Sequence, residues 1–507
     1  MSALLVSSEG EVVAEESVSF GSDLTQYQAP QGFVEGPLEG EIFSDPLMWL
    51  EALDLCLERM QQKGVRFSSV VGVSGAGQQH GTVYLNQEWE NCLKGLNSAT
   101  SLKEAFTPAL SRRLSPIWMD TSTSEECKEV AQALGGDLEV CRRSGSVPIE
   151  RFSGPQIRKF AKSQPSAYTA THRIHLVSSF FSSVLTGTDA PIDPGDGFGM
   201  NLVELRSEDW DEDLLNATAT HLHDKLPPIK SSTSIIGRVS PYFSRKYGFS
   251  NSASVVIFTG DNPSSLVGMG AEKPGKVVVS LGTSDTFFAA MSEPRTDPIG
   301  YGHVFGNPMG GYLSLVCFRN GSLAREKIKD SLGVDWSAFD SRGLEESPPG
   351  NNGNGLLPFF GPEISPRIEA ARPVRFGSEA FKSNPTKAEL IRACLEGQFL
   401  NMRIQTEWIG KTPDTILLTG GASASDGIAQ TIADIMEAPV DRLKSSGSVA
   451  IGGVIRAASA CGGDVKILQK ELCSPQKNSR TQPRKETSSA YHHLMDTFKA
   501  NLDAILG

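Results

Sequence analysis

The stretch SVVIFTGDNPSSLVGMG, residues 254–270, joins an apolar run, a Gly-Asp-Asn-Pro turn and a run of small residues. The apolar run predicts a buried strand, and Gly260 allows the sharp turn that follows it. Asn262 is of a type that caps helices and Pro263 suits a first helical turn, so we expect a helix to begin here. The pattern places the carboxylate of Asp261 at the carboxyl end of a strand, where open α/β sheets bind their ligands.

Two roles are open for Asp261. It is a cap or turn residue if its oxygens serve only the neighbouring backbone N–H groups. It is a general base if its carboxylate accepts the proton of a substrate hydroxyl that attacks a phosphorus atom. The residues of the stretch alone leave both interpretations standing.

A second apolar strand, in GKVVVSLGTSDTFFAAM at residues 275–291, ends in a small polar tip. Gly282, Thr283 and Ser284 offer backbone N–H groups and two hydroxyls within a small radius, which is a workable phosphate cradle. Most Gly-Thr-Ser tips are ordinary turns, so the motif alone is a weak signal.

The segment DTILLTGGASASDGIAQTIADIMEAPV, residues 414–440, predicts a strand, a Gly-Gly turn, a helix and a further strand. Gly420 and Gly421 let a flat ligand approach the backbone closely, or they make only a tight strand-to-helix turn. Both interpretations require the same glycines at the same place.

Polar side chains that suit a sugar follow an earlier strand. His80 lies in the glycine-rich loop GAGQQHG beside Gln78 and Gln79, and these neutral hydrogen-bonding groups suit a polyol better than a metal. A lone histidine is more often structural. Arg151, in IERFSGPQIRK, is either a ligand contact or a surface salt-bridge residue.

The composition excludes several classes of protein. The 507 residues are 39% hydrophobic and 21% charged, as in ordinary globular proteins, and the net charge of −12 argues against a nucleic-acid or polybasic membrane-surface protein. No apolar run approaches the roughly 20 residues that span a bilayer, and the start lacks the features of a signal peptide. The eight scattered cysteines include no C-x-x-C pair, which favours a reducing cytoplasm.

Strand-like and helix-like runs alternate along the chain, which favours α/β domains. Residues 3–20 predict a hairpin, and residues 45–64 predict an amphipathic helix that leads into a strand at 69–75. We expect a domain boundary near residue 270, giving domains 1–270 and 271–507, because a length of 507 residues exceeds one core. The polar segment 474–488 is expected to be a surface excursion or a disordered link.

Taken together and in this order, these segments resemble the FGGY family of carbohydrate kinases, and within it the eukaryotic xylulokinase branch. The resemblance extends from about residue 4 to 460 and is carried by the segments VSGAGQQHG, SPIWMDTSTSEEC, ERFSGPQIRK, LVSSFFSSVLTG, FTGDNPSSLVGM, VVVSLGTSDT, CFRNGSLAREKI, EGQF and TGGAS. It implies two ribonuclease-H-like domains of the actin-like ATPase type around a central cleft.

The resemblance also implies an activity, which is Mg·ATP-dependent phosphorylation of D-xylulose at its 5-hydroxyl. We expect a monomer or homodimer. The resemblance assigns the role of base to Asp261. The positions that match the family's sugar site are His80, Arg151, Asp261 and Asn262. The positions that match its nucleotide site are Gly282, Thr283, Ser284, Trp336, Gly420, Gly421 and Ser425.

The sequence departs from the family pattern in two places that bear on the nucleotide. Family members open with a strand and an Asp-x-[Ser/Gly]-Thr phosphate loop, whereas this sequence begins at what resembles the following strand, so we expect that first strand and loop to be missing. Ser425 stands where the family has an asparagine. We therefore keep three alternatives: a kinase of another pentulose or polyol, a sugar-binding pseudokinase, and an actin-like structural ATPase, which the polar sugar cluster disfavours.

Overall fold

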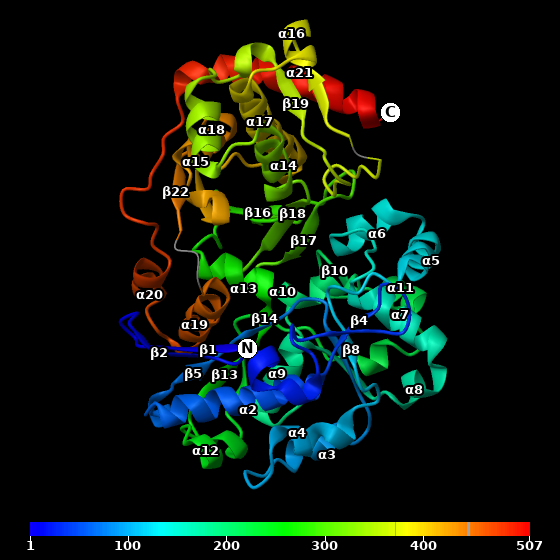
Figure 1. The fold of residues 1–507 in the computed structure, drawn as a ribbon. Coiled ribbons are helices and arrows are strands. Elements are labelled where there is room, and N and C mark those ends of the chain that lie inside the picture. Colours follow the sequence, from blue (N-terminus) through cyan, green and yellow to red (C-terminus); the bar gives the residue numbers. More distant parts are fainter. Residues whose placement is uncertain (371, 444–446, 507) are drawn as a thin grey trace. The chain divides into compact units, whose positions relative to one another are not determined.

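The computed structural model describes residues 1–370, 372–443 and 447–506, which form two compact units (Figure 1). The first unit contains Met1–Gly270, Val304–Tyr312 and Gly447–Cys473, and the second contains the other described residues. The predicted division of the sequence at residue 270 stays a prediction. The structure adds that two segments from beyond that position belong to the first unit.

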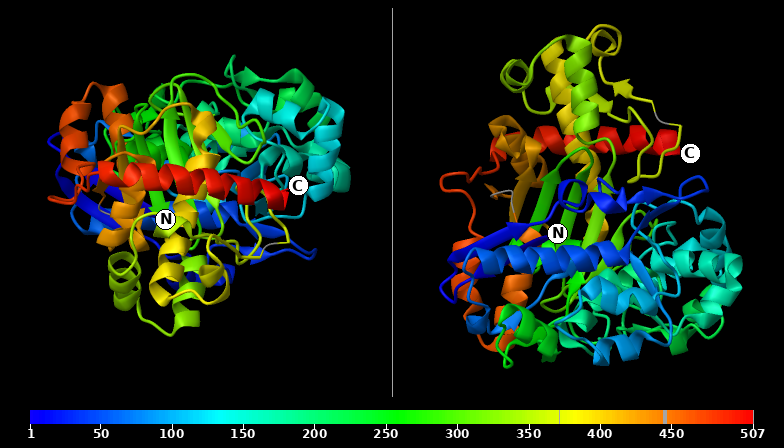
Figure 2. Two further views of the ribbon diagram at one scale, coloured as in Figure 1. Left: turned by 90° about the horizontal axis from the view of Figure 1, so that it is seen from above. Right: turned by 60° about the horizontal axis from the view of Figure 1, so that its bottom comes forward.

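The first unit opens with the predicted hairpin. Strand β1 (Ser2–Val6) pairs antiparallel with β2 (Val12–Ser17), and Ser2 lies opposite Ser17. Helix α2 (Pro46–Gln62) confirms the predicted amphipathic helix and lies beside the hairpin (Figure 2). Its start is capped by Asp45, whose side chain accepts a hydrogen bond from the Leu47 N–H.

Two pairs of short parallel strands lead into the loops that carry His80 and Asp261. Strand β5 (Gly72–Val73) pairs parallel with β13 (Ser254–Val256), and β6 (Ala76–Gly77) pairs parallel with β14 (Thr259–Gly260). Strand β12 (Ile235–Arg238) adds antiparallel to the free side of β13. The predicted strand at 69–75 is shorter than expected, because residues 67–69 form a 3-10 turn and the strand begins only at Gly72.

Three helices pack on these strands. They are α9 (Val177–Thr186), whose residues are all buried, α13 (Asp261–Gly268) and α19 (Ser448–Cys461), which Figure 1 shows near β1. The Ser182 hydroxyl of α9 accepts the Phe258 N–H, which fixes the chain between β13 and β14.

Helices α13 and α19 cross in backbone contact because glycines lie where they meet. A Cβ atom on Gly268 would lie 1.8 Å from the Ser448 carbonyl oxygen, and one on Gly452 would lie 1.9 Å from the Ser264 carbonyl oxygen. Ser264 adds a hydrogen bond to the Val449 carbonyl. This crossing holds the helix that begins at Asp261 against a helix nearly 190 residues later in the sequence.

The second unit is built on a sheet in which β15 is central. Strand β15 (Lys276–Leu281) pairs antiparallel with β16 (Asp285–Met291) and parallel with β21 (Thr415–Gly420), which pairs parallel with β22 (Val440–Arg442). The main helices of this unit are α14 (Ser322–Leu332), α15 (Trp336–Glu345), α17 (Lys387–Gln405), α18 (Asp426–Met436) and α21 (Ser488–Leu506). The predicted strand, turn, helix and strand at 414–440 are confirmed.

The remaining elements are mostly short. The strands are β3 (Val34–Glu35), β4 (Ile42–Ser44), β7 (Thr82–Leu85), β8 (Ser115–Pro116), β9 (Arg173–Leu176), β10 (Val203–Glu204), β11 (Asp209–Trp210), β17 (His303–Gly306), β18 (Tyr312–Phe318), β19 (Gly355–Leu357) and β20 (Val374–Phe376). The helices are α1 (Phe20–Asp23), α3 (Trp89–Lys94), α4 (Leu102–Phe106), α5 (Ser124–Leu134), α6 (Asp137–Ser144), α7 (Ser153–Ser163), α8 (Pro165–Ala170), α10 (Pro194–Gly197), α11 (Glu212–Thr218), α12 (Pro241–Tyr247), α16 (Glu379–Ser383) and α20 (Val465–Leu472). Within the described ranges, no helix combines the length and the apolar character needed to cross a membrane.

The polar segment 474–488 runs over the second unit and is bonded to it. Thr481 and Val440 exchange two backbone hydrogen bonds, and the Arg484 guanidinium pairs with the buried carboxylate of Asp434. Of the two predicted alternatives, the structure shows a surface excursion.

The close crossing of α13 and α19 at their glycines gives a prediction about stability. We expect Gly452→Ala to lower the unfolding midpoint, with a cost of about 1–3 kcal/mol, because the new methyl group meets the backbone oxygen of Ser264. The matched control is Gly361→Ala, because a Cβ there has no neighbour within 4 Å. Thermal and urea melts of both variants check this, and equal midpoints for the two would contradict the crossing.

Candidate functional site

The carboxylate of Asp261 lies at the junction of β14 and α13, and only one of its oxygens is occupied by the protein. Its Oδ1 accepts the Asn262 N–H at 2.9 Å and the Gln79 N–H at 3.4 Å. Its Oδ2 has no hydrogen-bond partner among the described residues. The expected cap was wrong, because the helix begins at Asp261 with Gly260 as its N-cap, which leaves the Asn262 side chain available.

Gln79 links Asp261 to the loop before it. The Asn262 side-chain amide donates to Gln79 Oε1 at 2.8 Å, and Gln79 is only 2% exposed. The sequence singled out Gln79 as part of a polar cluster without giving it a role. In the structure it joins the two loops that follow β6 and β14.

His80 is held in a single orientation by its surroundings. Its backbone adopts a left-handed conformation, with φ of 69°, which is uncommon for a residue with a side chain. Its ring nitrogen Nδ1 lies 2.8 Å from the Gly199 carbonyl oxygen, and its ring stacks on Phe152 with centroids 4.4 Å apart. A strained backbone with a fixed ring is typical of a functional position.

Arg151 is linked to His80 through the next two residues of the sequence, which both contact His80. Its guanidinium carbon lies 5.9 Å from the centroid of the Phe152 ring, and the Ser153 hydroxyl donates to the His80 carbonyl. The sequence analysis missed Phe152, although an aromatic residue between an arginine and a helix start is a usable signal. The structure thus brings His80, Arg151, Asp261 and Asn262 into one polar cluster joined by Gln79 and Phe152.

Two further carboxylates, which the sequence analysis did not assign to the site, are buried beside this cluster. Asp193 caps α10 and accepts the Ser232 hydroxyl at 2.6 Å. Asp196 accepts a hydrogen bond from the Ser178 hydroxyl at 2.5 Å, while its buried Oδ1 has no hydrogen-bond partner in the described part of the chain. The signal was the DPGD string at 193–196, which was available in the sequence.

Burial controls the charge of these carboxylates. Burial raises the pKa of Asp261, against the opposing effect of the backbone N–H groups of Asn262 and Gln79. Burial and the neighbouring Asp193 carboxylate raise the pKa of Asp196 well above its usual value. Burial also raises the pKa of Asp193, so all three carboxyls hold their protons more strongly than exposed aspartates do.

The second unit carries the predicted phosphate tip. Gly282, Thr283 and Ser284 form the turn between β15 and β16, and the Gly282 carbonyl accepts the Ser322 N–H at the start of α14. Directly after the tip, Asp285 forms a buried, bidentate ion pair with Arg325, with N···O distances of 2.8 and 2.9 Å. This pair fixes the base of the tip, while the Thr283 and Ser284 side chains are exposed.

The two predicted glycines of the adenosine turn differ in their surroundings. Gly420, with φ of 92°, lies so close to β15 that a Cβ would be 2.3 Å from the Leu281 carbonyl oxygen. Gly421 has open space where its Cβ would stand. The turn therefore lies against the phosphate tip on one side and leaves room for a flat group on the other.

Trp336 and Ser425 are connected through helix α15. Trp336 begins that helix and is 45% exposed, with its ring edge-on to Phe339 at 5.4 Å. The Ser425 hydroxyl caps α18 by accepting the Ile428 N–H, and it hydrogen-bonds Asp340 of α15. Ser425 thus has a structural role of its own, whereas the Trp336 ring is partly exposed, with the Lys329 Nζ 5.4 Å from its centroid.

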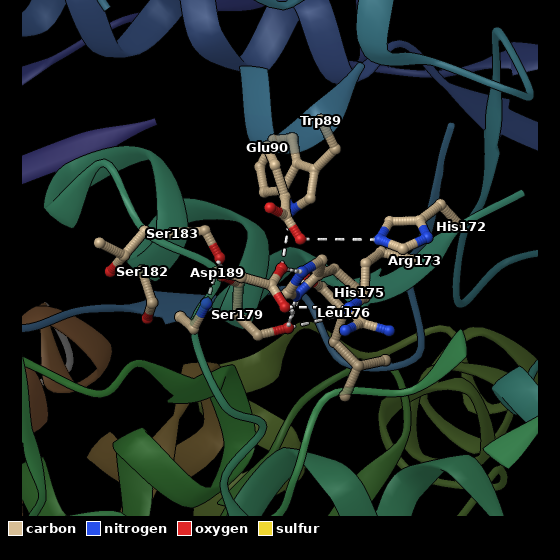
Figure 3. Close-up of polar contacts among 12 residues, drawn as sticks. Trp89, Glu90, His172, Arg173, His175, Leu176, Ser179, Ser182, Ser183 and Asp189 are labelled. Carbon is tan, nitrogen blue, oxygen red and sulfur yellow. Dashed lines mark hydrogen bonds and ion pairs between the residues drawn. The ribbon is translucent and has the colours of Figure 1, made fainter. Parts of the chain in front are cut away.

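A third polar network, shown in Figure 3, contains a serine, a histidine and an aspartate hydrogen-bonded in the order of a hydrolase triad. Its serine and histidine are buried, unlike those of a working triad. His175 lies between the Ser179 hydroxyl, 3.0 Å from Nδ1, and the Asp189 carboxylate, 2.9 Å from Nε2. Burial favours neutral Asp189, but the His175 and Trp89 hydrogen bonds outweigh it and hold its pKa below the usual range. Because His175 and Ser179 are buried, we assign this network a structural role.

Comparison with known proteins shows the family. Residues 109–268 match the N-terminal domain, and residues 277–461 the C-terminal domain, of the FGGY family of carbohydrate kinases. The chain is 39% identical to the rat xylulose kinase over 97% of its own length and 92% of that protein. It is 38% identical to xylulose kinase 2 of Arabidopsis thaliana over 90% of its length and 85% of that protein. The chain belongs to the FGGY family of carbohydrate kinases.

Solved structures show the same fold at lower identity. The xylulose kinase of Bifidobacterium adolescentis is 22% identical with a TM-score of 0.76, over 97% of this chain and 96% of that one. The Plasmodium falciparum glycerol kinase is 16% identical with a TM-score of 0.77, over 98% of this chain and 95% of that one. The fold is therefore the predicted one, with two actin-like ATPase domains, and kinases of this family use ATP.

The exposed tryptophan gives a binding prediction. We expect Trp336→Ala to weaken ATP binding about two- to tenfold, because a lost aromatic contact costs about 0.5–1.5 kcal/mol beyond its area. Titration calorimetry with ATP checks this, and Trp118→Ala, at a residue 52% exposed in the first unit, is the matched control. Equal ATP affinities for the two variants would show that Trp336 does not contact the nucleotide.

Proposed function

We propose that this chain phosphorylates D-xylulose at its 5-hydroxyl with ATP, and that Asp261 is the general base. The observation that carries the proposal is the buried carboxylate of Asp261, which keeps Oδ2 unoccupied in a cluster of sugar-binding character. Relatives named xylulose kinases, at 38–39% identity over nearly the whole chain, support the choice of sugar.

The chemical step is a single displacement. The sugar hydroxyl oxygen forms a bond to the γ-phosphorus, the bond from that phosphorus to the bridging oxygen breaks, and ADP leaves. Asp261 Oδ2 takes the hydroxyl proton. Its Oδ1 stays fixed by the N–H groups of Gln79 and Asn262, which aim the second oxygen without blocking it.

The neighbours of Asp261 bind the sugar in this proposal. His80, Arg151 and the Asn262 amide supply hydrogen bonds to the sugar oxygens, and a site built to bond hydroxyls rejects ligands that lack them. Gln79 is a positioning residue, because it holds the Asn262 amide through its Oε1.

The second unit binds the nucleotide in this proposal. The backbone N–H groups and hydroxyls at Gly282, Thr283 and Ser284 hold phosphate, the space beside Gly421 takes the adenosine, and Trp336 stacks on the base. Mg²⁺ would neutralise phosphate charge, and the exposed hydroxyls of Thr283 and Ser284 would hold it together with the phosphates. The exposed hydroxyls of the tip fit that role.

The remaining features of the proposal follow from composition. Eight cysteines, all in the described part of the chain, form no disulfide with one another, which supports a reducing cytoplasm. The net charge of −12 supports an enzyme without nucleic-acid or membrane partners. We assign it the state of a monomer or homodimer.

The decisive experiment compares Asp261→Asn with the parent chain in a coupled ADP-release assay with D-xylulose. Loss of the base lowers kcat by about 10²–10⁴-fold, while D-xylulose binding by calorimetry changes far less. Asp503→Asn, an exposed aspartate on α21, is the control and retains full turnover. D-Ribulose and glycerol, run in parallel, test the sugar.

Three outcomes would count against the proposal. Unchanged turnover in Asp261→Asn would exclude it as the base. Faster turnover of D-ribulose would establish another pentulose kinase. D-Xylulose binding without turnover by the parent chain would establish a sugar-binding pseudokinase.

The pH dependence tests the same carboxylate. A base must be ionised to accept a proton, so turnover falls as the pH drops through the pKa of Asp261. Because burial raises that pKa, we expect the acid limb of kcat/KM to lie above the ordinary aspartate value of about 3.9. Circular dichroism at each pH separates this limb from unfolding, and a limb below pH 3.9 in folded protein would contradict the assignment.

A further inference from the structure

The ring of His80 is held by contacts that fix both its backbone and its orientation. Its Nδ1 lies 2.8 Å from the Gly199 carbonyl oxygen, and its ring stacks on Phe152 with an interplanar angle of 29°. Its own backbone carbonyl accepts hydrogen bonds from the Thr82 and Ser153 hydroxyls at 3.0 and 3.2 Å. These contacts keep one rotamer on a backbone whose φ of 69° is uncommon for a residue with a side chain.

The Gly199 carbonyl decides which ring nitrogen of His80 carries the proton. A carbonyl oxygen only accepts hydrogen bonds, so Nδ1 has to be the donor in this contact and carries a hydrogen. In the neutral ring the other nitrogen, Nε2, then holds the lone pair. A neutral histidine in this tautomer accepts a hydrogen bond at Nε2 and does not donate one there.

Gly199 lies at a place where a side chain would move the histidine ring. A Cβ atom on Gly199 would lie 3.0 Å from His80 Cε1 and 3.1 Å from His80 Nδ1. Gly199 is part of the buried 3-10 turn Phe198–Met200. Asn201 holds the end of this turn, because its side-chain amide donates to the Ser144 hydroxyl at 2.9 Å. The carbonyl that sets the tautomer therefore comes from a fixed element.

We propose that Gly199 is a positioning residue that makes His80 a hydrogen-bond acceptor, so that the sugar must present a donating hydroxyl to Nε2. The inference rests on the proposed function, because it takes His80 as a contact of the sugar. Arg151 makes the opposite demand, since a guanidinium only donates. A keto oxygen can only accept, so it fits the donors of Arg151 and does not fit Nε2 of His80.

Nitrogen NMR on the full chain with isotope-labelled histidines tests the tautomer without sugar or nucleotide. At about pH 8, above the ordinary histidine pKa of about 6.5, the ring is neutral. We expect the His80 signals, assigned by their loss in His80→Asn, to show a protonated Nδ1 and a lone pair on Nε2. A proton on Nε2 instead would overturn the proposal even if the enzyme turns over D-xylulose.

Addition of D-xylulose then tests the contact itself. We expect the Nε2 signal to change while Nδ1 keeps its proton. An unchanged Nε2 signal, with D-xylulose bound according to calorimetry, would overturn the contact and leave the kinase activity standing. Failure of D-xylulose to bind would overturn the contact together with the proposed function.

Two variants of His80 separate its two nitrogens. In His80→Asn the amide replaces Nδ1 and keeps the bond to Gly199, whereas in His80→Gln the longer side chain carries an acceptor to the place of Nε2. We expect calorimetry to show D-xylulose binding at least about tenfold weaker to the asparagine variant than to the glutamine variant. Because asparagine suits a left-handed backbone better, a purely structural role predicts the reverse order, which would overturn the proposal.

Gly199→Ala tests the positioning role. The new methyl group displaces the ring of His80, so we expect D-xylulose to bind about three- to tenfold more weakly, which is the loss of one ordinary hydrogen bond. The matched control is Gly361→Ala, where a Cβ has no neighbour within 4 Å. Equal affinities of the two variants would overturn the role of Gly199. If melts show that Gly199→Ala does not fold, the tautomer signal and the two His80 variants decide the question.

Discussion

The buried guanidinium of Arg456 holds together the two strand ends from which the loops of His80 and Asp261 leave. It comes from α19, is fully buried, and donates to the carbonyls of Ile257 and Gly75. Gly75 precedes the loop to His80, and Ile257 precedes the turn to Asp261. Burial lowers the pKa of Arg456 to about 10, so the side chain remains charged at neutral pH and its hydrogen bonds keep their strength.

The rest of the first unit follows from this constraint. Because Arg456 joins both strand ends, α19 must lie directly over them, and the glycines at its crossing with α13 make that distance possible. Asp261 then begins a helix that cannot shift, which leaves its Oδ2 in a defined direction. The same burial that surrounds the carboxylate raises its pKa, which suits the general base proposed for this position.

Local pattern predicted much of this structure. The hairpin, the helix at 46–62, the Gly-Thr-Ser tip and the position of Asp261 each depend on neighbours within a few residues, so periodicity and turn chemistry were sufficient. The helix cap was misassigned because both Gly260 and Asn262 are good capping residues. Arg456, Asp196 and the membership of α19 in the first unit depend on contacts across up to 381 residues, which no local pattern contains.

The discontinuity of the first unit has a consequence for its synthesis. Its longest segment ends at Gly270, yet α19 and the residues after it, as far as Cys473, arrive about 200 residues later. At ribosomal rates of about 5–20 residues per second, the nascent chain waits roughly 10–40 seconds before Arg456 reaches its two carbonyls. During that interval most of the second unit is made while the segments that carry Gly75 and Ile257 lack their cover, so the first unit completes its fold only after residues far beyond its longest segment have been synthesised.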